Sequence, residues 1–244
     1  MKNNQIIIML VIINLIYLCS CNRRSNKNAL EFALSVDCIN DSIPQVKIGN
    51  QTWTTKNLDV CAFKNGDQIL QVKNEEEMKA AADEEKPCWC YRNFDSSYNH
   101  LYGKLYNWYA VIDPRGLAPV GYSIPSLEDY EKLCKTLGGK LIAGKKMKAK
   151  CGWRNAGLNE SIQDISDNES GFSALPGRYF SNSFLDGDFD GVFANYWTSS
   201  EPSFATNDFD AYYVELLSGT DFFSVSWGNQ KVKWAFMPVR CVKN

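Results

Sequence analysis

The residues best suited to chemistry form an acidic run, Asp186-Gly-Asp-Phe-Asp-Gly191. Alternating carboxylates at Asp186, Asp188 and Asp190 can converge on one cation, and glycine permits the tight turn that this requires. The spacing therefore predicts a calcium site. An EF-hand is excluded, because Trp197 stands where that loop needs a bidentate glutamate. A solvated acidic turn that binds no ion explains the same residues and remains the alternative.

Nine cysteines supply a second set of chemically versatile groups. Besides Cys19 and Cys21 near the N-terminus, they are Cys38, Cys61, Cys88, Cys90, Cys134, Cys151 and Cys241. An exported protein permits disulfides, but this odd number leaves at least one thiol free or paired elsewhere. Cys88 and Cys90 share one face of a predicted strand, where they are poorly placed to bond each other. The pairing stays open, and so does a metal site that uses both of these thiols; Cys134 is equally well explained as packed core.

Hydrolytic chemistry has weaker support. The single histidine, His100, lies in a polar stretch, which argues against histidine-based triads and His-rich zinc sites. Without such a base, Ser199 and Ser200 are better explained as turn hydroxyls than as nucleophiles. Glu169 and Glu201 could form a carboxylate pair for sugar hydrolysis, but the sequence does not give their separation.

Composition indicates a globular, exported protein. Hydrophobic residues make up 45% of the 244 residues, charged residues 22% and aromatic residues 13%. The net charge is -2, so nucleic acid is not an expected partner. The many aromatic side chains fit either a helix-poor core or a surface on which sugars or peptides stack.

The N-terminus predicts a lipid anchor. Lys2 precedes an apolar run, residues 6–18, which is too short to span a membrane comfortably and is typical of a signal peptide. The run ends in Leu18-Cys-Ser-Cys21, which resembles the lipobox of bacterial lipoproteins. That resemblance implies a signal peptide over residues 1–20 and acyl chains on Cys21, which hold the protein on a membrane. We expect residues 21–44 to form the lipidated N-terminus and linker, and the protein to lie in the cell envelope, at the outer membrane of a Gram-negative bacterium.

Local patterns predict several elements in the first half of the chain. Residues 46–53 alternate around Gly49-Asn50, which predicts a hairpin. Asn74 and Ser126 are each expected to cap a helix. The helix that begins after Ser126 carries Tyr130, Leu133 and Leu137 on its apolar face and ends at Gly138-Gly139. Other expected elements are a strand over 87–91, a polar loop over 94–100 and a buried helix over 102–110.

The second half has fewer helical signals. A loop-rich region pinned by large side chains, among them Phe172, Leu175 and Trp197, follows residue 142. Strands are expected over 212–217, 222–227 and 234–242. We expect these strands and the N-terminal hairpin to form one sheet.

Several of these motifs, in this order, resemble the Fibrobacter succinogenes major paralogous domain, a family found in secreted and lipid-anchored bacterial proteins of the Bacteroidetes and Fibrobacteres. The matching stretches are 51–53, 57–58, Pro87-Cys-Trp-Cys-Tyr91, 102–103, 105–108, 118–119, Gly121, 124–125, 137–139, 144–148, Gly171-Phe-Ser-Ala-Leu-Pro-Gly177, Trp197-Thr-Ser-Ser-Glu201 and Val239-Arg-Cys-Val242. Two positions depart from the family pattern, Tyr122-Ser123 and the residues before Val239, where Pro238 must occupy an edge or non-bonding position.

The resemblance implies a C-type lectin-like fold, shared with formylglycine-generating enzymes, over residues 45–244. This is an α+β fold in which two helices pack on small twisted antiparallel sheets beside a long loop-rich region. On such a fold we expect a non-catalytic binding or adhesion domain for glycan or protein, and the acidic run makes calcium the one candidate cofactor. A structural component of a surface assembly is the alternative. A formylglycine-generating type of enzyme is a further alternative, although no residues here match the cysteine pair with which those enzymes hold copper.

Overall fold

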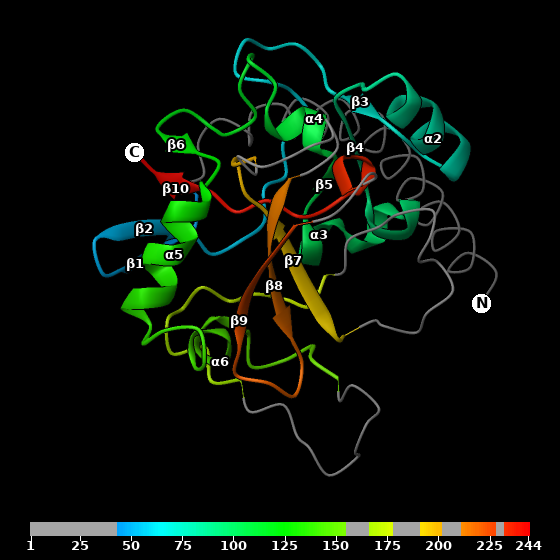
Figure 1. Cartoon of the computed structure of the whole chain (residues 1–244). Coiled ribbons are helices and arrows are strands. Elements are labelled where there is room, and N and C mark those ends of the chain that lie inside the picture. The colour runs from blue at the N-terminus through cyan, green and yellow to red at the C-terminus, as the bar shows by residue number, and fades with distance from the viewer. Residues whose placement is uncertain (1–42, 155–165, 178–190, 202–210, 228–231) are drawn as a thin grey trace, which may run out of the picture. The chain divides into compact units, whose positions relative to one another are not determined.

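The computed structural model describes residues 43–154, 166–177, 191–201, 211–227 and 232–244. Residues 44–244 form one unit, to which all the elements below belong. Its described part combines helices with three small sheets, so the predicted α+β class is confirmed (Figure 1).

The first sheet joins the two ends of the unit. β1 (Gln45–Ile48) and β2 (Gln51–Thr54) form the predicted hairpin. Gly49 has a φ of 58°, a conformation that glycine adopts without steric cost. β10 (Val242–Lys243) lies between β2 and β6 (Tyr122–Ser123), which gives the order β1-β2-β10-β6.

The second sheet contains β3 (Leu70–Gln71), β4 (Cys88–Cys90) and β5 (Leu105–Tyr106). β3 and β4 are parallel, so the sheets are not all antiparallel as the resemblance implied. α2 (Glu75–Asp83) begins at Asn74, whose side chain accepts a hydrogen bond from the Glu77 amide at 2.9 Å, as predicted. The helix and strands enclose a small core of Val72, Met78, Ala81, Cys88, Cys90, Leu105 and Phe236.

The predictions for residues 94–110 were wrong. The expected loop contains η1 (Arg92–Phe94), η2 (Ser96–Tyr98) and the short helix α3 (Asn99–Tyr102). The expected single helix is divided into β5 and α4 (Trp108–Val111). Asn107 separates them, because its side chain bonds the Cys88 amide at 3.0 Å and the Lys86 carbonyl at 2.7 Å. These long-range bonds hold the chain against β4 and override the helical spacing of its apolar residues.

The third sheet contains β7 (Phe193–Trp197), β8 (Tyr212–Leu217) and β9 (Phe223–Trp227), in that order. The two strands predicted around residues 212–227 are confirmed. The prediction that they join the N-terminal hairpin is wrong, because they pair with β7 instead.

The predicted strand over 234–242 was also wrong, except at its end. η3 (Val232–Trp234) precedes an irregular segment whose backbone bonds go to different elements. Met237 exchanges two 3.0 Å bonds with Tyr106, and the Pro238 carbonyl accepts from the Trp197 amide at 3.3 Å. Pro238 has no amide hydrogen to donate, so it cannot complete a regular ladder.

The larger core lies between α5 (Leu127–Thr136), α6 (Ala143–Met147) and the first and third sheets. Ser126 and Asp129 form the predicted capping box of α5. The predicted apolar stripe of Tyr130, Leu133 and Leu137 is buried. Two of the predicted pins, Phe172 and Trp197, are fully buried, whereas Leu175 is half-buried.

Arg240 is embedded in this core. Its side chain donates to the Asn57 side chain and to the backbone carbonyls of Thr54, Phe172 and Ser173, at 2.7 to 3.0 Å. The guanidinium also lies 4.7 Å from the centre of the Phe172 ring. The buried charge therefore has four hydrogen-bond acceptors around it, which offset the cost of removing it from water.

Candidate functional site

The candidate site lies where α5 ends. Glu131, Cys134 and Lys135 occupy one side of the helix, because residues three and four apart are neighbours on its surface. Gly138 and Gly139 then take positive φ values of 104° and 96°. Their amides bond the carbonyls of Lys135 and Cys134, which closes the last turn and redirects the chain.

A backbone hydrogen bond joins this turn to the third sheet. The Phe223 amide of β9 donates to the Lys140 carbonyl at 2.8 Å. Gly144 allows the backbone of α6 to approach the backbone of Phe222 closely. A Cβ at position 144 would lie 2.1 Å from the Phe222 carbonyl oxygen. The site is therefore built on α5, α6 and β9.

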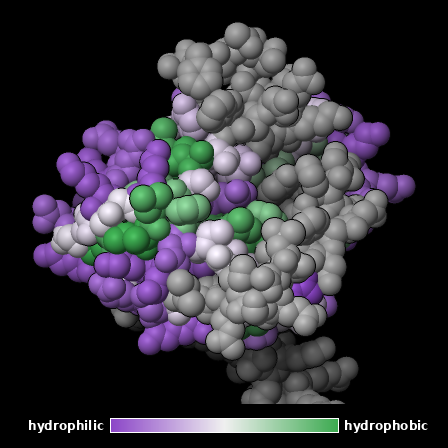
Figure 2. Space-filling view, turned by 60° about the horizontal axis from the view of Figure 1, so that its bottom comes forward, coloured by the Kyte–Doolittle hydropathy of each residue, from purple (hydrophilic) through white to green (hydrophobic). Residues whose placement is uncertain are grey.

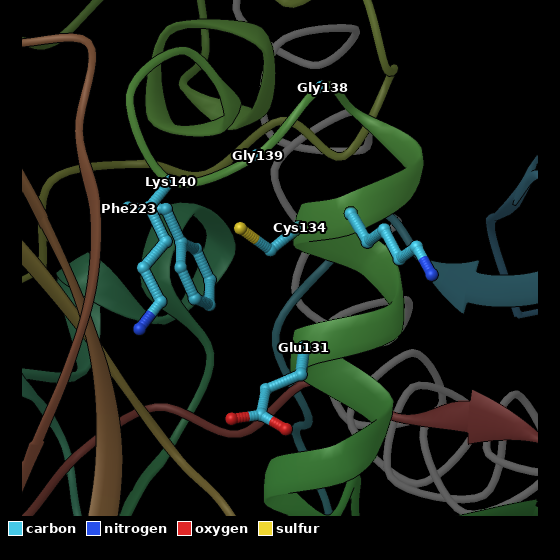
Figure 3. Close-up of a pocket in the computed structure, with 7 residues that line it drawn as sticks. Glu131, Cys134, Gly138, Gly139, Lys140 and Phe223 are labelled. Carbon is cyan, nitrogen blue, oxygen red and sulfur yellow. The ribbon is translucent and has the colours of Figure 1, made fainter.

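A pocket of about 460 Å³ opens between α5 and β9. It is lined by Glu131, Cys134, Lys135, Gly138, Gly139, Lys140 and Phe223. Figure 3 shows the Cys134 sulfur directed across the pocket toward Phe223. The side chains of Glu131 and Lys140 extend in the same direction from opposite walls. The pocket thus combines an apolar interior with charged groups at its rim, a pattern typical of binding sites.

The rim charges are available to a ligand. Within the described ranges, none of Glu131, Lys135 and Lys140 lies in an ion pair, whereas Lys132 on the same helix pairs with Glu128 at 3.0 Å. Burial raises the pKa of the Cys134 thiol, with a smaller opposing effect from Lys140. A protonated thiol is a poor nucleophile, so Cys134 contributes to the apolar surface of the pocket.

Exposed apolar side chains adjoin the pocket. We define the apolar patch as Leu141, Ile142 and Phe222, which are 70%, 41% and 54% exposed. Leu141 and Phe222 are chain neighbours of the bonded residues Lys140 and Phe223. Figure 2, which brings the α6 end of the unit forward, shows apolar residues gathered among hydrophilic ones on this face. Such patches on a folded protein commonly mark interaction sites.

The site residues predicted from sequence lie outside the described residues. Asp186, Asp188 and Asp190 fall in the range 178–190, and Cys21 and Cys38 fall in 1–42. The calcium site and the lipidated cysteine therefore stay predictions. Among the residues that the structure does describe, no three His, Cys, Asp or Glu side chains come together as a metal site.

The six described cysteines all carry free thiols. Cys61 and Cys151 are exposed, whereas Cys134, Cys241 and the β4 pair are buried. Burial raises the pKa of Cys88 to about 12 and that of Cys90 well above its usual value. A thiol that burial keeps protonated is a poor nucleophile, so neither Cys88 nor Cys90 is poised to react as a thiolate.

The hydroxyl and carboxylate candidates have structural partners. Ser199 donates to the Ile124 carbonyl at 3.2 Å, and the Ser200 hydroxyl accepts from the Leu127 amide at 3.0 Å at the start of α5. Glu169 pairs with Lys146 at 3.1 Å, and Glu201 pairs with Lys233 at 2.8 Å. The serine contacts fit the prediction that these residues are turn hydroxyls. The two glutamates form ion pairs with different lysines.

Sequence reasoning missed the pocket. Glu131 and Lys135 look like ordinary solvated residues on the polar side of a helix. Only the approach of Phe223 and Lys140, from a distant strand and from the turn, makes that side part of a binding site. The adjacent apolar residues Leu141 and Ile142, directly after the turn, were a signal that the sequence did contain.

None of the described helices is long and apolar enough to cross a membrane; residues 1–42 lie outside that description. A family model described as the Fibrobacter succinogenes major domain matches residues 46–243. No curated protein and no solved structure matches the chain.

Proposed function

The chain belongs to the Fibrobacter succinogenes major domain family, and from that premise we propose that it is an envelope-anchored protein that binds a ligand without transforming it. The anchor is Cys21, after removal of residues 1–20, at the outer membrane of a Gram-negative bacterium. The binding domain is a variant of the C-type lectin-like fold. Support for the fold comes from the α+β arrangement and from β2 and β10, which join the two ends of the unit.

One observation carries this proposal: the pocket and the apolar patch form adjoining parts of one surface. The pocket offers an open volume of about 460 Å³, which suits a single large side chain or a small molecule. The patch extends the apolar surface beyond it. A ligand that covers both would bury the exposed side chains and leave the charged rim to fix its orientation.

The ligand that fits this surface best is a protein. Two of the three patch residues, Leu141 and Ile142, are aliphatic, so only Phe222 offers a flat ring on which a sugar could stack. Exposed aliphatic groups next to lysines and glutamates match the apolar centre and polar rim of protein interfaces. The glycan ligand expected on such a fold is therefore the second choice.

The experiment compares the full chain with Leu141→Asp and Phe222→Asp variants, each produced in its native membrane. Chemical cross-linking and copurification from envelope membranes should recover a protein that both variants lose. Val120→Asp is the matched control, because Val120 is 87% exposed and is not one of the residues that form the pocket or the patch. A partner recovered equally with all three variants, or glycan-array binding that the patch variants leave unchanged, would contradict the proposed surface. A stable complex that forms with several envelope proteins at fixed stoichiometry would instead favour the structural assembly role.

Calcium binding by Asp186, Asp188 and Asp190 remains a separate proposal, supported by their spacing. Isothermal titration of the full chain with Ca²⁺ should show one site that the Asp188→Asn variant loses. Heat changes that are equal in the two proteins would leave the acidic run as a solvated turn.

A further inference from the structure

Among the described strands, β9 lies at one edge of the third sheet. In an antiparallel pair, successive residues alternate between bonding toward the partner strand and pointing away from it. Tyr212 of β8 exchanges backbone bonds with Thr198 and Ser200, so it faces the β7 side. The alternate residues Tyr213 and Glu215 then face β9, where their partners are Ser226 and Ser224.

The remaining residues of β9 must direct their backbone groups outward. Phe223 confirms this, because its amide donates to the Lys140 carbonyl, which is outside the sheet. Val225 and Trp227 follow with the same alternation. Within the part of the chain that the structure describes, no backbone group pairs with the outward amide or carbonyl of Val225.

The turn after α5 therefore forms one backbone hydrogen bond with β9, at Phe223, as a paired strand would. Beyond that bond, the chain turns away from β9. Lys140 occupies the position opposite Phe223, and the chain continues into α6. The pocket lies at this point, between α5 and the beginning of β9 (Figure 3). The pocket therefore lies next to the part of β9 whose outward backbone groups have no partner among the described residues.

We propose that an extended segment of a partner protein adds to β9 as a new strand at Val225 and Trp227 and places one large apolar side chain in the pocket. This inference rests on the proposed binding function and specifies its ligand. Strand addition supplies affinity through backbone bonds, and a pocket beside the edge supplies specificity for a side chain. Free edges are sites at which other chains pair.

Charge defines the segment further. The residues that line the pocket include two lysines, Lys135 and Lys140, and one glutamate, Glu131. Because these groups lack ion-pair partners among the described residues, the local charge is net positive. The segment therefore carries an acidic residue next to its apolar anchor, which the lysines attract.

The experiment uses the full chain in lipid nanodiscs and a displayed library of random dodecapeptides. Enriched sequences should contain an aromatic or large aliphatic residue beside Asp or Glu, and synthetic copies are then titrated. Methylation of single peptide amides on the wild-type protein tests strand addition directly. Affinity should fall about tenfold at alternate positions only, since each lost backbone bond is worth about that factor.

Protein variants provide the complementary measurement. Val225→Pro removes the outward donor while leaving the bonds to β8, and Val225→Ala loses similar packing but keeps the amide. We expect the proline variant to bind about tenfold more weakly than the alanine variant. Cys134→Phe, which fills the pocket, should abolish binding, and Lys140→Glu should weaken it at least fivefold. Lys79→Glu on α2 is the charge control and should bind as wild type does.

The outcomes separate this inference from the proposed function. Peptides that need an open pocket but tolerate every amide methylation overturn strand addition and leave a binding pocket. A dimer that Val225→Pro converts to monomer shows that a second copy occupies the edge, and this also overturns the inference. If no peptide binds while the patch variants still lose an envelope partner, strand addition is wrong but the proposed function stands. If the variants keep both the envelope partner and the peptide, the inference and the proposed function are both wrong.

Discussion

Arg240 and Lys140 are both basic residues that lie close to a phenylalanine, but their surroundings are opposite. Arg240 is 1% exposed, and four hydrogen bonds join it to the backbone and to Asn57. Lys140 is exposed at the rim of a pocket, without an ion-pair partner among the described residues. The first charge is bound by its own protein, whereas the second is free to bind something else.

The presence or absence of internal partners distinguishes residues that hold the fold together from residues that can bind a ligand. Residue type alone does not make this distinction. A buried charge is tolerated only where every donor has a partner, so the partners of Arg240 fix the surrounding chain in one arrangement. A ligand that competed for those donors would have to unfold the core. At the end of α5, by contrast, the described residues leave charge and apolar surface without partners, and a ligand can use both.

Arg240→Met should have the largest effect. It removes the donor from the buried carbonyl of Phe172 and from the part-buried carbonyl of Ser173, and each such loss costs about 1–3 kcal/mol. We expect the free energy of unfolding to fall by about 4 kcal/mol, measured by chemical denaturation with tryptophan fluorescence. Arg240→Lys keeps the charge but cannot bond in several directions at once, so it should lose about half as much. A loss below about 1 kcal/mol for the methionine variant would show that these bonds do not hold the core.

Gly144→Ala should have the next largest effect, and it acts on the scaffold of the pocket. The added Cβ would lie 2.1 Å from the Phe222 carbonyl oxygen and 2.6 Å from its carbon, both of which are backbone atoms. The clash forces α6 away from the strand, at a cost of about 2–3 kcal/mol of unfolding free energy. Lys145→Ala in the same helix is the control and should change stability by less than about 1 kcal/mol. A Gly144→Ala variant as stable as wild type would show that α6 and β9 can separate freely.

Glu201→Gln should have a small effect that depends on pH. The hydrogen bond from Lys233 chiefly lowers the pKa of Glu201, and the bond from Trp108 adds to this. A lowered pKa stabilises the fold above the ordinary glutamate value of about 4.3, and this contribution disappears as pH falls through the folded value. Since half of the Glu201 side chain is exposed, we expect a difference of about 0.5 kcal/mol at about pH 7. Urea titrations should show the two proteins converging below about pH 4; a constant gap would mean that the charge of Glu201 is not the cause.

The elements that could be predicted from sequence are those that local contacts determine. The hairpin turn at Gly49 and the capping box of Ser126 and Asp129 each need only a few adjacent residues. The segment 102–110 could not be predicted in this way. Its apolar spacing fits a helix, but Asn107 bonds the distant backbone of Lys86 and Cys88 and divides it.

The same limit applies to the candidate site. Glu131 and Lys135 differ in no local way from the other polar residues of α5, and the pocket exists only because β9 reaches them. The hydrogen bond between Phe223 and Lys140 that brings them together joins segments far apart in sequence. Sequence patterns describe each wall of the pocket, whereas tertiary packing decides that the walls face each other.

Lys140→Gln should have the smallest effect on stability and the clearest effect on binding. The side chain is exposed and forms no ion pair within the described residues, so its substitution removes no stabilising charge interaction among them. We expect unfolding free energies within about 0.5 kcal/mol of wild type, as for most surface changes. Binding of an acidic, apolar peptide should weaken severalfold, and raising the salt concentration should reduce this difference because salt screens the exposed charge. If the variant instead lost stability as Arg240→Met does, Lys140 would belong to the architecture, and the distinction between the two regions would fail.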